Sequence, residues 1–240
     1  MFAKKLPLLV IPAAVAAIAG CGSSAPQATS TPTAASESTA GTVAESAPGA
    51  FTASELRGAL LSRINGAPAA LKPEAGPYGS LEEVKATKNS MHGVVVTPAK
   101  CSSATLTGFN SSTFSNSPAA VSTFRVGRNG VSEVVMAPSA SAAKSALGKS
   151  VPSGCSHYHA TVGGKTFSYQ VREAWVDGIG DEARVLNVDA VGYPQVNVWS
   201  VVYRGGGIVG AVTVVGPDAS ETAVRQLGQQ AYTYAIKRLG

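Results

Sequence analysis

Short runs of apolar residues, separated by turn residues, dominate the chain from residue 94 to residue 215 and predict a sheet of hairpins. Asn129-Gly130 lies between two such runs and is a strong hairpin signal, because both residues tolerate positive φ. Gly163-Gly164 and Gly205-Gly206-Gly207 separate further pairs of runs. The predicted strands cover residues 94–96, 121–126, 131–137, 156–162, 165–175, 183–190, 196–204 and 208–215.

Apolar residues at helical spacing precede this region. A Ser/Thr-x-x-Glu capping box begins at Thr52 and favours the start of a helix there. Apolar side chains then recur at Leu56, Leu60 and Ile64, which places them on one face of a helix. We therefore expect a first amphipathic helix that ends near Asn65-Gly66.

A long helix is predicted at the C-terminus, beginning at Asp218 with Glu221 as its capping-box partner. Its expected buried face consists of Val224, Leu227, Ala231 and Tyr234 or Ala235. Two shorter helices are expected over residues 81–88 and 138–148. The predicted fold class is α+β, an antiparallel β-sheet of hairpins packed against N- and C-terminal helices.

The first 20 residues have the layout of a bacterial signal peptide. Lys4 and Lys5 precede an apolar stretch over residues 6–19, and at about 14 residues this stretch is shorter than the roughly 20 needed to span a bilayer. Ile18-Ala19-Gly20-Cys21 resembles the lipobox of bacterial lipoproteins, whose cysteine takes a lipid before cleavage. We expect a lipid anchor of palmitate-type acyl chains on Cys21. The alternative is an ordinary secretory cleavage site with a chance cysteine.

The segment after Cys21 is rich in Ser, Thr, Ala and Pro and has almost no large apolar side chains, so it cannot bury enough surface to fold. We expect three regions: a lipoprotein signal peptide (residues 1–20), a lipidated cysteine with a disordered tether (residues 21–50), and a single folded domain (residues 51–240). The folded domain would stand at the extracytoplasmic face of the cell membrane.

Charge argues against nucleic acid as a partner. The formal net charge is +5, and loss of the two signal-peptide lysines lowers it to +3. The remaining Lys and Arg residues are scattered singly and form no basic stripe. The expected partners are therefore the membrane, through the lipid anchor, and a small molecule, a lipid or an envelope protein as ligand.

Two cysteines remain in the folded region, Cys101 and Cys155. Outside the cytoplasm an even pair of cysteines implies a disulfide. Cys155 is also followed by His157 and His159, and on a strand all three would face one side, so zinc binding with both thiols reduced is the alternative. We expect the disulfide and no metal.

Residues 178–183 fit the G-x-G-x-x-A pattern of a dinucleotide site. Asp181 and Glu182 would repel a pyrophosphate, and a strand, not a helix, is predicted to follow. We therefore expect a structural turn and no cofactor. The chain has no G-x-S-x-G or H-E-x-x-H motif and only three histidines, so we expect no enzyme activity.

Several short motifs resemble the extracytoplasmic sensor domain of PknH-type actinobacterial serine/threonine kinases, a domain that stand-alone lipoproteins share. They are Leu60-Leu61-Ser62, Val96-Thr97-Pro98-Ala99-Lys100-Cys101, Ala137-Pro138-Ser139-x-x-Ala142, Cys155, and Gly178-Ile179-Gly180-Asp181-Glu182-Ala183. Related domains often carry two disulfides, whereas this chain can form one. The resemblance implies a sheet-and-helix domain whose cleft is proposed to bind a ligand, with no catalytic residues to carry over.

Two classes of function are open at this point. The first is a lipid-anchored ligand-binding or sensor-like lipoprotein of the cell envelope, without catalysis. Its cleft would be lined by aromatic side chains, and the candidates are Tyr158, Tyr169, Trp175, Trp199 and Tyr203. The alternative is an extracytoplasmic hydrolase or metal-dependent enzyme that acts on envelope material.

Overall fold

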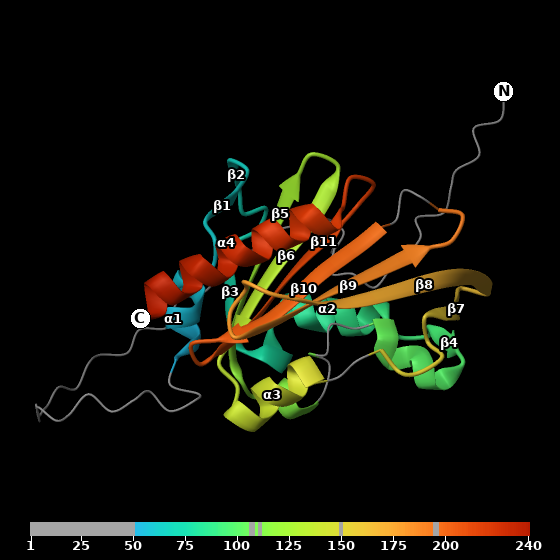
Figure 1. The fold of residues 1–240 in the computed structure, drawn as a ribbon, viewed down its shortest axis with the longest axis horizontal. Coiled ribbons are helices and arrows are strands. Elements are labelled where there is room, and N and C mark those ends of the chain that lie inside the picture. The colour runs from blue at the N-terminus through green and yellow to red at the C-terminus, as the bar shows by residue number, and fades with distance from the viewer. Residues whose placement is uncertain (1–50, 106–108, 110–111, 149–150, 194–196) are drawn as a thin grey trace, which may run out of the picture.

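The computed structural model describes residues 51–105, 109, 112–148, 151–193 and 197–240, and its main element is one nine-stranded antiparallel sheet. Its strand order is β3-β5-β6-β11-β10-β9-β8-β7-β4, and a separate small hairpin pairs β1 with β2 (Figure 1). The strands are β1 (Arg63–Ile64), β2 (Ala67–Pro68), β3 (Glu74–Pro77), β4 (Val95–Thr97), β5 (Pro118–Val126), β6 (Asn129–Met136), β7 (His157–Val162), β8 (Lys165–Val176), β9 (Glu182–Ala190), β10 (Asn197–Gly205) and β11 (Ile208–Val215). The helices are α1 (Ala53–Gly58), α2 (Glu82–Ser90), α3 (Ala140–Gly148) and α4 (Glu221–Leu239), with 3₁₀ turns at Tyr78–Ser80, Ala99–Thr105 and Ser112–Phe114. The predicted α+β class is confirmed.

The predicted hairpins are present, with one change in the position of a turn. β5 and β6 form a hairpin, but Val126 pairs with Asn129, so the two turn residues are Gly127 and Arg128. Gly127 is the first of these two residues and has φ 60°, and a type II′ turn requires a positive φ at this position. Asn129-Gly130 therefore belongs to the strand and not to the turn.

The first helix is shorter than the sequence predicts. The capping box at Thr52 is present, but α1 ends at Gly58. Asn65, with φ 48°, and Gly66 instead form the turn between β1 and β2. Leu60 and Ile64 are buried as expected, although the chain between them is not helical. The Asn-Gly turn signal thus prevailed over the helical spacing.

The C-terminal helix begins three residues later than predicted. Ser220 is its N-cap, and its Oγ accepts the N–H of Ala223 at 3.2 Å. Asp218 instead forms an ion pair with Arg128 in the turn between β5 and β6. The buried side chains include Val224, Leu227, Ala231 and Ala235, as the spacing predicted.

Helices cover both faces of the sheet. On one side, which we call the α4 face, α1 and α4 pack against inward residues such as Val201 and Tyr203. On the other side, the α3 face, α2 and α3 pack against residues such as Val202 and Val209 (Figure 1). The terminal helices α1 and α4 thus cover one face of the sheet, and the shorter helices α2 and α3 cover the other. No helix in the part of the chain that the structure describes is long and apolar enough to cross a membrane.

A third cluster of buried residues surrounds the disulfide at the far end of the sheet. Cys101 and Cys155 are fully buried and joined, which confirms the predicted bridge. The cluster includes Val96, Tyr158, Tyr169, Val171, Leu186 and Val188. These residues lie on the α3 face of strands β4 and β7–β9, because Tyr169 and Val171 pair with Ala190 and Val188.

Candidate functional site

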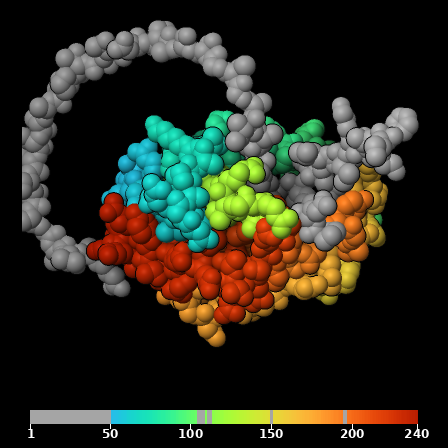
Figure 2. Space-filling model, turned by 90° about the horizontal axis from the view of Figure 1, so that it is seen from above, coloured from blue at the N-terminus to red at the C-terminus, as the bar shows by residue number. Residues whose placement is uncertain are grey.

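The α4 face becomes polar where strands β7, β8 and β9 extend beyond the apolar core under α4. Along these strands the inward side chains belong to the disulfide cluster, so the alternate side chains face the opposite way. We call this surface the open polar face, and it comprises His157, His159, Ser168, Gln170, Arg172, Asn187, Asp189 and Asn197. Figure 2 shows the C-terminal residues (red) beside those of β8 and β9 (gold and orange) on this side of the molecule.

Strand register aligns these side chains in rows across the sheet. Arg172 pairs with Asn187, which in turn pairs with Trp199. Asp189 lies between Gln170 and Asn197 in the next row. Residues from three strands thus become neighbours, although 27 positions separate Arg172 from Trp199 in the chain.

A hydrogen-bond network fixes the centre of the open polar face. The side-chain nitrogen of Asn187 lies within hydrogen-bond distance of three acceptors that share its two N–H groups: Asp189 Oδ1 at 3.2 Å, Asn197 Oδ1 at 2.9 Å and the carbonyl of Val198 at 3.1 Å. Asn197 Nδ2 donates to the carbonyl of Ala219 at 3.0 Å and so joins the network to the segment before α4. These side chains are held in place before any ligand arrives, which lowers the entropy cost of binding.

The outer part of the network is exposed and carries compensating charges. The Arg172 side chain is 60% exposed, donates to Gln170 Oε1 at 3.2 Å and lies 3.7 Å from Asp189 Oδ2. An ion pair this exposed contributes at most about 1 kcal/mol to stability. The guanidinium and carboxylate are therefore accessible for exchange with the polar groups of a ligand.

The five aromatic candidates do not gather on one surface. Tyr158 and Tyr169 stack at a centroid distance of 5.1 Å within the disulfide cluster. Trp175 lies on the same face of β8 as Tyr169 but is 59% exposed. Trp199 and Tyr203 lie on the α4 face, where Tyr203 is fully buried against Tyr232. Of the five, Trp199 is the one whose cross-strand neighbour belongs to the open polar face.

Residues 178–183 form a turn into the central strand β9, as predicted. The N–H of Asp181 donates to the carbonyl of Arg204 at 2.8 Å, and Gly180 has φ 64°. Glu182 forms two hydrogen bonds with the Arg204 guanidinium at 2.8 and 2.9 Å, and these bonds lower the pKa of Glu182. The strand β9 and not a helix follows, so the loop does not lead into the helix N-terminus that binds the pyrophosphate in a dinucleotide site.

The disulfide removes both thiols as metal ligands. Among the described residues, no group of three or more His, Cys, Asp or Glu side chains could hold a metal ion. His159 contacts a serine instead, with Nδ1 3.0 Å from Ser168 Oγ. Such a pair is the beginning of a nucleophilic site, but no hydrogen bond between His159 and an orienting carboxylate is found in the described part of the chain.

Sequence analysis missed one buried carboxyl group. Glu133, in the middle of β6, is fully buried on the α4 face, and its Oε2 accepts the N–H of Leu61 at 3.0 Å. Its Oε1 and the hydroxyl of Tyr203 have no hydrogen-bond partner within the described residues. Burial raises the pKa of Glu133 to about 8. The available signal was the alternation Val131-x-Glu133-x-Val135, which puts Glu133 at an inward position.

No protein-family model matches the chain, and no curated protein is similar to it in sequence. Two solved structures are similar in fold. One is the extracellular domain of PknH from Mycobacterium tuberculosis, with 14% identity and a TM-score of 0.46 over 70% of this chain and 82% of that one. The other is an uncharacterised protein of Mycobacterium smegmatis, the Rv0999 ortholog, with 14% identity and a TM-score of 0.42 over 73% and 92% of the two chains. The first is the sensor domain that the sequence motifs resemble. At this level of identity and TM-score, neither similarity carries a functional conclusion.

Proposed function

We propose that this protein is a lipid-anchored, extracytoplasmic binding or sensor-like lipoprotein without catalytic activity. In this proposal residues 1–20 are the removed signal peptide, Cys21 carries the lipid, residues 21–50 are the tether and residues 51–240 form the single binding domain. The disulfide supports the location, because a buried Cys101–Cys155 bond persists in an oxidising compartment.

The observation that carries the binding role is the preorganised network of the open polar face. It presents a guanidinium, a carboxylate and the amide side chains of Gln170 and Asn197, and the buried Asn187 amide holds Asp189 and Asn197 in place from beneath. Hydrogen-bond donors and acceptors, together with one positive and one negative charge, suit the polar part of a ligand. That ligand is a small molecule, a lipid head group or an envelope protein. Trp199 supplies an apolar edge beside this network.

Native mass spectrometry of the full protein, purified from the membrane of its own host, tests the proposal. A bound mass should accompany the wild-type protein and be lost or strongly reduced in Arg172→Ala. Arg125→Ala is the matched control, because Arg125 is an exposed arginine on β5 outside the open polar face. Absence of any bound mass, or equal occupancy in wild type and Arg172→Ala, would contradict a binding role for this face.

The contact between His159 and Ser168 gives the second candidate, an envelope hydrolase, a specific test. A fluorophosphonate probe reacts with activated serines, so it should leave Ser168 unlabelled if the protein is non-catalytic. Labelling that disappears in Ser168→Ala would favour the hydrolase.

A further inference from the structure

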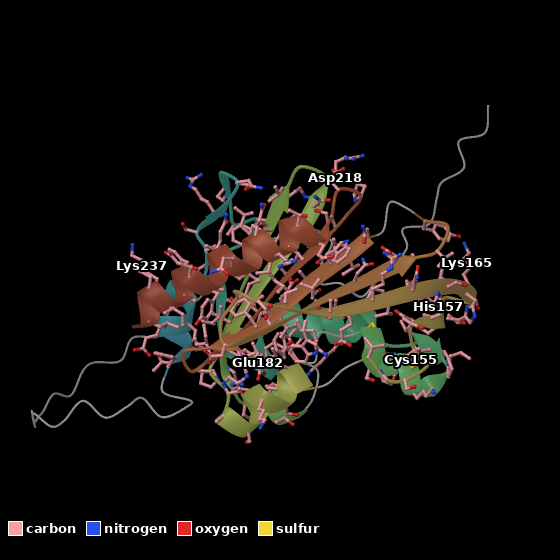
Figure 3. The ribbon with its side chains drawn as sticks, viewed as in Figure 1. Cys155, His157, Lys165, Glu182, Asp218 and Lys237 are labelled. Atoms are coloured by element: carbon pink, nitrogen blue, oxygen red, sulfur yellow. A yellow bond between two sulfur atoms is a disulfide. The ribbon has the colours of Figure 1, made fainter. Side chains whose placement is uncertain are left out.

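Two histidines stand side by side on the outer part of the sheet. His157 and His159 are two positions apart on β7, so both side chains project from the same face, and both are exposed. Figure 3 shows His157 at the outer end of the sheet, close to Cys155 of the disulfide. The sulfur atoms are bonded to each other, so the two imidazoles are the potential ligands that remain of the Cys-x-His-x-His sequence.

Each imidazole is held by a serine through the same ring nitrogen. Ser156 Oγ lies 3.3 Å from Nδ1 of His157, and Ser168 Oγ lies 3.0 Å from Nδ1 of His159. When Nδ1–H donates to the serine oxygen, the lone pair of Nε2 is left for another partner. This is the arrangement of metal-binding histidines, in which a hydrogen bond to one ring nitrogen sets the tautomer and orients the other.

The spacing suits chelation by a single ion. Alternate residues of a strand lie roughly 7 Å apart at their Cα atoms, so two imidazoles that project from the same face can both reach one metal ion with Nε2–metal distances of roughly 2 Å. The residues directly opposite on β8 are Gln170 and Ser168, which are uncharged. The Arg172 guanidinium, which donates to Gln170, is paired with Asp189, and this pairing compensates its charge.

We propose that His157 and His159 form a two-histidine chelate for a borderline divalent cation, Cu²⁺ ahead of Zn²⁺. Imidazole suits both ions, and Cu²⁺ binds nitrogen ligands more tightly. Water fills the remaining coordination positions, since the described residues contain no third His, Cys, Asp or Glu positioned to join the pair. The site is therefore labile and open to a further ligand from solution. It lies at the β7 end of the open polar face, and its test does not depend on whether that face binds another ligand.

Calorimetric titration of the full, untagged chain with CuCl₂ and then ZnCl₂ tests this site. One equivalent of Cu²⁺ should bind, and Zn²⁺ should bind more weakly. His157→Ala and His159→Ala should each weaken Cu²⁺ binding at least about tenfold, because even loss of an outer-shell partner commonly costs that much. The third histidine, exposed in the turn after α2, provides the matched control His92→Ala, which should leave this equivalent unchanged.

Two further measurements distinguish a defined two-histidine site from copper binding at separate histidines. Ser168→Ala should weaken Cu²⁺ binding by roughly tenfold while the melting temperature stays unchanged, because Ser168 orients His159. Electron paramagnetic resonance of the copper complex should show hyperfine coupling to two imidazole nitrogens in wild type and to one in either histidine variant. Wild-type affinity in His157→Ala or His159→Ala, or coupling to a single nitrogen in wild type, would overturn the proposal.

Discussion

Glu133 places a carboxyl group in the apolar core of the α4 face, and its replacement by glutamine should stabilise the protein at neutral pH. Glu133 is fully buried, and the Leu61 N–H is the one hydrogen-bond donor found for its carboxyl among the described residues. Burial therefore favours the neutral form and raises the pKa from 4.5 to about 8. In Glu133→Gln the amide oxygen can still accept the Leu61 N–H, and no proton has to be taken up.

The sign of the effect follows from proton binding. Because the pKa is higher in the folded state, the stabilising effect of the bound proton is complete below pH 4.5 and is lost as the pH rises to about 8. Over this window the free energy of unfolding of the wild type should fall by about 1.4 kcal/mol per pH unit. At pH 7 the accumulated loss is about 3 kcal/mol, which is the stabilisation expected for Glu133→Gln.

Urea unfolding at pH 5, 6, 7 and 8 measures this difference directly. The free energies of wild type and Glu133→Gln should be similar near pH 5 and diverge as the pH rises. The control Glu221→Gln changes an exposed glutamate in the first turn of α4 and should leave the pH slope as in the wild type. Parallel curves for wild type and Glu133→Gln would refute the assignment of a buried proton to Glu133.

Two other predictions concern the disulfide and the turn before β9. Alkylation without reductant should label neither Cys101 nor Cys155, and reduction should lower the melting temperature by roughly 10 °C, because the bridge closes a loop with a sequence separation of 54 residues. Labelling of both thiols in the unreduced protein would disprove the bridge. Gly180→Ala should cost more than about 3 kcal/mol by chemical denaturation, since its Cβ would lie 2.2 Å from the carbonyl oxygen of Arg204 at a positive φ. Gly178→Ala, at a positive φ in open space, should cost only about 1–2 kcal/mol, and equal losses in the two variants would show that the contact with Arg204 is unimportant.

The hairpins and the disulfide were predictable because their signals are local. Alternating strands, Gly-rich turns and a single pair of cysteines outside the signal region specify them without knowledge of the packing. The end of α1 was not predictable in this way. Leu60 and Ile64 fit a helix, and the core accepts both side chains from a turn and a short strand as well, so the spacing alone cannot distinguish the two conformations.

The candidate site depends on strand order, which the sequence does not specify. Arg172, Asn187 and Trp199 become neighbours only through the register of β8, β9 and β10. The aromatic candidates fail to gather for the same reason, because successive positions on these strands alternate between a covered and an open face. Trp199 is partly buried and Trp175 is exposed, and nothing in the local sequence of Trp175 marks it as exposed.

The intact mass of the mature protein, extracted with detergent from the host membrane, tests the central claim most directly. We expect a chain that begins at Cys21, lacks residues 1–20 and carries a diacylglycerol with or without an additional amide-linked acyl chain. Its mass should be two hydrogens lower than that of the reduced form because of the Cys101–Cys155 bond. In Cys21→Ala the lipid mass should vanish and the protein should leave the membrane fraction. A wild-type chain that retains Met1, or one cleaved without any added lipid, would contradict the claim that this protein is a lipid-anchored extracytoplasmic lipoprotein.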